Sequence, residues 1–110
     1  MKVHVEDISN IEKKVVVELP ADVVDKALSE QFKRYGRTAR VKGFRPGKVP
    51  PSLVKQMFRR EAQSAATGEL IQNSLFDAMQ EVDIEPLNMP DIDREDLVEG
   101  EGFTYSAVCQ

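Results

Sequence analysis

A cluster of glycines and prolines near the middle of the sequence limits what the chain can fold into. Two glycines and three prolines fall between Gly43 and Pro51, which excludes a continuous helix or a central strand there. From Ala21 up to this cluster, apolar residues recur at the 3.6-residue period of a helix. Pro51 suits the first position of a following helix. The sequence therefore predicts two helices joined by an exposed loop.

The first predicted helix carries an apolar stripe and an ordered set of charges. Asp22 stands near its start and is expected to act as the N-cap, while basic residues gather near its end, which suits the helix dipole. Gly36 costs about 1 kcal/mol relative to alanine, so we expect the last part of the helix to fray or bend. The apolar stripe is expected at Val24, Leu28, Phe32 and Ala39, with Tyr35 beside it.

The second helical region is the longest predicted element and reads as two consecutive stretches. The first begins at Pro51 and the second at about Glu61, and the segment 83–86 is expected to end the region. Their apolar faces are expected at Leu53, Val54, Met57 and Phe58, and then at Ala62, Ala65, Ala66, Ile71, Leu75, Met79 and Val82.

Strand patterns flank the helices on both sides. The first twenty residues have the pattern of a hairpin that turns at Ser9-Asn10 and ends at Pro20, and residues 103–109 alternate as a strand does. The segment 91–99 is expected to contain one short edge strand. This order predicts an α+β domain in which the helical hairpin packs on an antiparallel sheet of about four strands, with the loop at the hairpin tip, away from the sheet.

The chain is expected to be one domain, because 110 residues is an ordinary domain size. The strand pattern runs up to Gln110, so we interpret residues 1–110 as a domain excised from a longer chain, with its last strand left at an unpaired edge. No apolar run approaches the ~18 residues of a membrane span. The opening residues lack a signal peptide and the single cysteine cannot form an internal disulfide, which favours a cytoplasmic location.

Positive charge is concentrated in the middle of an acidic chain. Residues 31–60 contain ten of the fifteen basic residues and no Asp or Glu, so this segment is +10. The remaining five basic and nineteen acidic residues make the rest −14. A local cationic block of this size favours contact with a polyanion. The alternative is a solvated basic face that only improves solubility.

The sequence offers no convincing catalytic or metal-binding set. His4 lies in a strand pattern, Cys109 is next to the last residue, and no metal, phosphate-loop or nucleophile motif occurs. We therefore expect no catalytic residue, metal or cofactor in this domain. The aromatic residues are expected in the core, with Phe44 as the exception: Phe32, Tyr35, Phe58, Phe76, Phe103 and Tyr105.

The loop sequence Gly43–Pro50, GFRPGKVP, closely resembles the Gly-Phe-Arg-x-Gly-x-x-Pro signature of bacterial trigger factors. The similarity extends to the Val-x-Val-Glu opening at 3–6, the Leu-Pro-Ala-Asp helix start at 19–22 and the Phe-Thr-Tyr-Ser strand at 103–106. It therefore covers the whole chain and implies the N-terminal ribosome-binding domain of that chaperone family. The family docks beside the polypeptide exit tunnel, contacting ribosomal protein and rRNA of the large subunit, and shelters nascent chains.

The resemblance also implies roles for individual residues. Phe44 and Arg45 match the docking pair, while Pro46 replaces a position that is often lysine in the family and is expected only to stiffen the loop. Lys42 and Lys48 are expected to compensate for that lost charge. The expected ribosome-binding residues are Gly43, Phe44, Arg45, Gly47, Lys48 and Lys42, with Arg37 and Arg40 as a supporting basic patch. A peptidyl-prolyl isomerase domain is implied beyond residue 110, so this fragment itself is not expected to be an enzyme.

Two further hypotheses stay open at this point. One is a free-standing RNA-binding module that uses the basic segment 31–60, although the loop is Gly-x-x-x-Gly where a KH domain has Gly-x-x-Gly. The other is a weak homodimer formed through surfaces that further domains or a second copy would cover.

Overall fold

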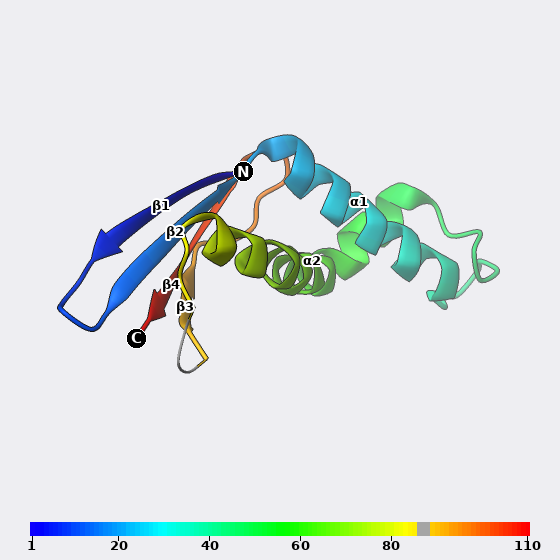
Figure 1. Cartoon of the computed structure of the whole chain (residues 1–110). Helices are drawn as coiled ribbons and strands as arrows, with labels where there is room; N and C mark the ends of the chain where they lie inside the picture. The colour runs from blue at the N-terminus through cyan, green and yellow to red at the C-terminus, as the bar shows by residue number, and fades with distance from the viewer. Residues whose placement is uncertain (86–88) are drawn as a thin grey trace.

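The chain forms one four-stranded antiparallel sheet and two helices, and the helices lie together on one face of the sheet (Figure 1). The computed structural model describes residues 1–85 and 89–110. This confirms the predicted α+β architecture, including the short strand in the acidic segment. The elements in chain order are β1 (Lys2–Asp7), β2 (Lys13–Leu19), α1 (Ala21–Thr38), α2 (Pro51–Glu81), β3 (Asp91–Arg94) and β4 (Phe103–Cys109).

The sheet has the order β1-β2-β4-β3, so the last strand lies in its interior. β4 pairs with β2 along its whole length, from Leu19↔Phe103 to Lys13↔Cys109, and with β3 on its other side. The expectation that the last strand would present an unpaired edge is therefore wrong, since β1 and β3 form the edges. The chain returns to the sheet after the helices and inserts β4 beside β2, where its inward side chains are all buried.

The core lies between the sheet and the helices, as strand alternation requires. Val15 and Val17 of β2 are fully buried, and so are Phe103 and Tyr105 of β4, all on the face that meets the helices. The helices contribute buried residues of their own stripes to the same cluster, namely Val24, Leu28, Ala66, Leu70, Ala78 and Met79. The predicted core is confirmed except at Phe76, which is 67% exposed, and at Met57, which is 47% exposed.

The N-cap of helix α1 lies two residues earlier than predicted. Pro20 occupies the N-cap position with an extended backbone, and its carbonyl accepts hydrogen bonds from the N–H groups of Val23 and Val24. Asp22 therefore lies inside the first turn, where its charge suits the dipole, and the prediction that it caps the helix is wrong. The predicted fraying at Gly36 is also wrong, because the helix continues to Thr38.

Helix α2 is a single element of 31 residues with one kink. Its backbone leaves helical geometry at Phe58 (φ −114°, ψ 19°), close to the predicted break between two stretches. The predicted start at Pro51 is confirmed. The helix ends at Glu81, followed by Asp83 in the left-handed region at φ 57°; Pro86, the other expected stop signal, lies outside the described residues.

The helical hairpin gives the molecule an elongated shape of about 60 × 24 × 19 Å. Only the C-terminal half of α2 and the start of α1 lie over the sheet, and the loop that joins the helices lies at the opposite end (Figure 1). The predicted position of the loop, away from the sheet, is confirmed. A partner molecule can therefore bind the loop without touching the sheet.

Candidate functional site

Two consecutive tight turns build the loop at the hairpin tip. In the first turn, the N–H of Phe44 donates a hydrogen bond of 3.0 Å to the carbonyl of Val41. In the second, the N–H of Lys48 donates a hydrogen bond of 2.9 Å to the carbonyl of Arg45. Gly43 and Gly47 stand at the third position of their turns with φ of 91° and 82°. That conformation needs glycine, and open space surrounds both residues, so backbone geometry rather than packing requires them.

The second turn accounts for the proline in this loop. Pro46 and Gly47 occupy the second and third positions of the turn, which is the Pro-Gly pattern of a type II turn. Proline fixes its own φ near the value that this position requires. Pro46 thus fits the stiffening role that its sequence position suggested.

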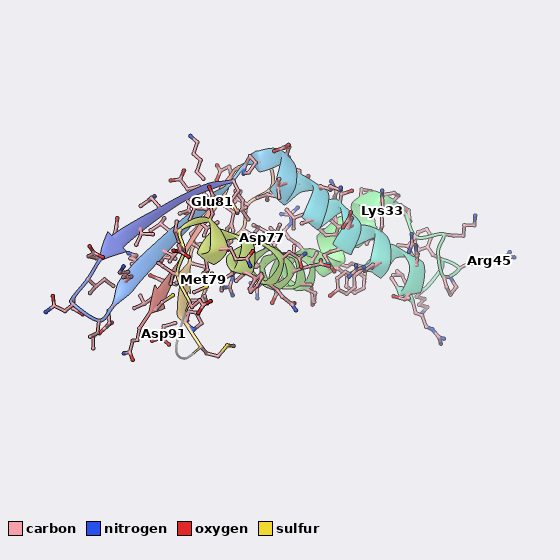
Figure 2. The ribbon with its side chains drawn as sticks, viewed as in Figure 1. Lys33, Arg45, Asp77, Met79, Glu81 and Asp91 are labelled. Atoms are coloured by element: carbon pink, nitrogen blue, oxygen red, sulfur yellow. The ribbon has the colours of Figure 1, made fainter. Side chains whose placement is uncertain are left out.

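Phe44 and Arg45 lie where the two turns meet. Phe44 closes the first turn and Arg45 opens the second, so the fold sets this pair by two backbone hydrogen bonds. Phe44 is 43% exposed, and Arg45 extends from the far end of the molecule (Figure 2). An apolar ring and a guanidinium therefore stand side by side at the tip.

Buried residues anchor both ends of the loop. Ala39, just after α1, and Val49, just before α2, are each about 5% exposed, although their neighbours in the loop are exposed. The N–H of Ala39 also donates to the carbonyl of Tyr35, which closes the last turn of α1. The exposed segment is thus fixed at its base while its tip remains open to a partner.

The predicted basic residues surround the pair on the same end of the molecule. Lys42 and Lys48 are exposed within the two turns, Arg37 is exposed in the last turn of α1, and Arg40 is exposed just after it. In the described part of the chain, the ion pairs of the basic segment involve Arg34 with Glu69 (3.6 Å) and Lys55 with Glu99 (3.2 Å). The cations nearest the tip are therefore free to meet an external anion.

Sequence reasoning missed the contact that supports the tip from below. The rings of Tyr35 in α1 and Phe58 in α2 stack with centroids 5.0 Å apart and planes 7° from parallel. Both were expected only as core residues, and both are half-buried. A signal was present in the sequence, since both are aromatic residues near the apolar stripes of the two helices that the loop joins.

A shallow groove of about 460 Å³ continues from the loop along the hairpin. Phe32, Val49 and Val54 supply apolar lining, and Lys33 and Arg37 supply positive charge. The loop residue Gly47 also borders it. Asp25 and Glu99 also line the groove, so the apolar surface beside the loop extends onto the helices among charges of both signs.

The described residues were also compared with the requirements of a metal site and of a membrane span. Within them, no group of three or more His, Cys, Asp or Glu side chains is arranged to hold a metal ion, and no helix is long and apolar enough to cross a membrane. Burial raises the pKa of the Cys109 thiol, which disfavours its reactive thiolate.

Comparison with known proteins identifies the family. The family model described as "Bacterial trigger factor protein (TF)" matches residues 1–110. The chain belongs to the bacterial trigger factor family. It is 36% identical over its full length to the trigger factor of Marinobacter nauticus and 39% identical to that of Desulfosudis oleivorans.

A solved structure confirms the trigger factor fold. The chain superposes with a TM-score of 0.74 and 15% identity on the structure titled "Promiscuous Substrate Recognition in Folding and Assembly Activities of the Trigger Factor Chaperone", over 99% of this chain and 26% of that one. The chain likewise spans 25% of the length of the two trigger factors named above. Fold and family are thus shown for a segment that is a quarter of its relatives' length.

Proposed function

We propose that this trigger factor domain docks on the large ribosomal subunit beside the polypeptide exit tunnel, and that Phe44 and Arg45 make the central contact. The observation that carries the proposal is the pairing of an exposed phenylalanine with an arginine at the junction of two glycine turns. An aromatic ring and an arginine held together at an exposed tip are the residue types that most often anchor an interface. Family membership supplies the ribosome as the expected partner.

The two side chains suit different parts of a mixed protein and RNA surface. Covering the ring of Phe44 in an apolar pocket removes it from water and contributes about 1.5–3 kcal/mol when burial is complete. Arg45 can form a bidentate contact with a carboxylate or a phosphate. Because the turns fix both residues before contact, little loop entropy is lost on binding.

The surrounding cations strengthen the encounter with an anionic surface. Lys42 and Lys48 lie in the same loop as Arg45, which Figure 2 shows at the end of the molecule away from the sheet, and Arg37 and Arg40 lie at the end of α1 that enters this loop. Ribosomal RNA would attract this end and orient the domain tip-first. Affinity should therefore fall steeply as salt concentration rises.

The family resemblance extends the proposal to the whole protein. Nascent polypeptides are its proposed clients, the cytoplasm its proposed location, and a peptidyl-prolyl isomerase domain is proposed beyond residue 110. The present fragment is proposed to contribute docking and no isomerase activity. Prolyl isomerisation by the purified 110 residues would contradict that division.

The proposal is tested by co-sedimentation of the domain with 70S ribosomes. Phe44→Ala and Arg45→Ala should each abolish binding and leave the far-UV circular dichroism spectrum unchanged. Met57→Ala is the matched control, because Met57 is similarly exposed on the same hairpin but outside the loop. Retained binding in both loop variants would refute the docking role.

The same assay separates docking from general RNA binding. A free-standing RNA-binding module would bind naked ribosomal RNA as tightly as whole ribosomes, with the same salt dependence. A docking domain should bind intact large subunits much more tightly than their extracted RNA. Equal affinity would favour the RNA-binding alternative.

A further inference from the structure

A polar groove lies where the long helix α2 meets the end of strand β3. It has a volume of about 410 Å³ and is bounded by α2, by the last residue of β3 and by the segment 96–98 that follows it. This volume falls within the range of cavities that hold small ligands. Most of its lining is polar and includes Arg60, Gln63, Ser64, Thr67, Arg94 and Asp96. We call it the arginine groove.

One face of α2 forms the floor of the arginine groove. Arg60, Ser64 and Thr67 are spaced by four and three residues, which places them on the same side of the helix. The hydroxyl of Thr67 donates to the carbonyl of Gln63 over 2.7 Å, and the side-chain amide of Gln63 donates to the carbonyl of Leu97 over 3.1 Å. Leu97 is buried. The floor and the facing segment are thus held together before any ligand binds.

Arg94 enters the groove from the sheet. It pairs with Tyr105, which is buried on the helix-facing side, so the side chain of Arg94 starts from that same side. Because β3 is an edge strand, Arg94 stays exposed while it lies beside α2. In the part of the chain that the structure describes, neither Arg60 nor Arg94 forms an ion pair. Two guanidinium groups that border one cavity are therefore available to an external ligand.

The charges in the groove select a particular kind of oxyanion. A guanidinium donates parallel hydrogen bonds to two oxygens of a phosphate or a carboxylate. Asp96 borders the same cavity, and an ionised carboxylate accepts hydrogen bonds but donates none. It therefore repels an oxyanion that has no proton and accepts a hydrogen bond from one that keeps a proton. A phosphate monoester has a second pKa of about 6 and so keeps one near that pH, as does inorganic phosphate, whereas sulfate and the phosphodiesters of nucleic acid do not.

We propose that the arginine groove binds a phosphate group that carries a proton, either as free phosphate or as the terminal group of a phosphate monoester. Arg60 and Arg94 hold the unprotonated oxygens, and Asp96 accepts the hydrogen bond of the phosphate O–H. The exposed hydroxyl of Ser64 can donate to a further oxygen. Selectivity comes from one repulsive group, Asp96, set among attractive ones. The backbone of RNA lacks the required proton, so this site differs in ligand from the docking loop.

The test is an amide NMR titration of the isotope-labelled chain at about pH 6 and constant ionic strength. It compares inorganic phosphate, methyl phosphate, sulfate and dimethyl phosphate. The first two should each bind at least tenfold more tightly than the last two. Sulfate carries more negative charge than phosphate at this pH, so sulfate binding as tightly as phosphate would reduce the contact to charge alone and overturn the proposal. Tighter binding of methyl phosphate than of phosphate would identify a monoester as the ligand, and the reverse order would identify free phosphate.

Variants then assign the roles of the three charged residues. Arg60→Gln and Arg94→Gln should each weaken phosphate binding at least tenfold and leave the far-UV circular dichroism spectrum unchanged. Arg59→Gln is the matched control, because Arg59 is the exposed neighbour of Arg60 on α2 but does not border the groove. Asp96→Asn should bring the affinity for sulfate to within threefold of that for phosphate. Unchanged phosphate affinity in both groove arginine variants, or a full preference for phosphate in Asp96→Asn, would overturn the proposal.

The same titration locates the bound ion. Amide shifts should be largest at residues 60–67 and 94–98, and shifts confined to residues 37–48 would place the ion on the basic loop and refute the assigned site. Dimethyl phosphate that bound in the groove as tightly as phosphate would assign the groove to a nucleic-acid backbone and would also overturn the proposal. Because no ribosome is present in the titration, its result does not depend on whether ribosome docking is confirmed.

Discussion

The rings of Tyr35 and Phe58 stack in parallel across the helical hairpin at the residue where α2 kinks, with centroids 5.0 Å apart. Gly36, next to Tyr35, lies at the same level and approaches Val54 of α2. The kink of α2 and the aromatic contact between the two helices therefore lie at the same residue, Phe58. This contact supports everything toward the tip.

The stack should couple the two helices energetically. Tyr35→Leu and Phe58→Leu keep apolar volume but remove the ring contact, and a double-mutant cycle should give a coupling of about 1 kcal/mol. Urea denaturation of the four proteins measures it. Strictly additive effects of the two substitutions would show that the rings are neighbours without mutual stabilisation.

Glycine substitutions should have opposite effects in the loop and in the helix. Gly47→Ala forces a side chain into a left-handed conformation at a cost of about 1–2 kcal/mol, so the second turn should rearrange and ribosome affinity should fall. Gly36→Ala is the matched control, since it lies in α1 with room for a Cβ at 3.8 Å from Val54. It should stabilise the domain by about 0.5–1 kcal/mol.

Thermal or urea denaturation, together with ribosome co-sedimentation, checks both glycine variants. Stabilisation by Gly47→Ala, or loss of stability in Gly36→Ala, would contradict the backbone conformations described for these positions.

Much of the fold could be predicted from periodicity. The Gly/Pro cluster, the helix stripe of α1 and the alternation of residues 103–109 each depend on local chemistry, and each prediction is confirmed. The errors concern tertiary placement. Phe76 sits at the edge of an apolar stripe and lines an open groove beside the edge strand β3, so it is exposed. The order of the strands could not be predicted either, because the local sequence of β4 does not specify that it pairs between β2 and β3.

The site was predicted for a different reason. Phe44 was conspicuous because it lacked apolar neighbours in the sequence, and its exposure follows directly. The roles of Gly43, Pro46 and Gly47 follow from residue type, but their division into two turns that meet between Phe44 and Arg45 depends on backbone hydrogen bonds that residue type does not specify. Composition alone could not locate the supporting stack.

A buried phenol should make stability depend on alkaline pH. Burial raises the pKa of Tyr105 above its ordinary value of 10.0, and a 2.6 Å hydrogen bond with Ser74 opposes the rise. Because the folded-state pKa is higher, the contribution of Tyr105 is complete below pH 10 and is lost as the pH rises through that raised value.

Tyr105→Phe should therefore lower the free energy of unfolding by about 1 kcal/mol at pH 7, through the lost hydrogen bond, yet flatten the decline above pH 10. Tyr35→Phe is the matched control, because Tyr35 lies outside the buried core; it should keep the wild-type profile. Urea denaturation from pH 8 to 11 gives the comparison, and parallel profiles for wild type and Tyr105→Phe would contradict the assignment.

The measurement that tests the docking account most directly is the affinity of 70S ribosomes for two arginine variants. Arg45→Ala and Arg59→Ala remove the same charge from the same basic segment, but Arg45 lies in the loop and Arg59 lies in α2 just after its kink. The account predicts at least a tenfold loss of affinity for Arg45→Ala and at most threefold for Arg59→Ala. Equal losses would mean that bulk positive charge, rather than the loop, binds the ribosome.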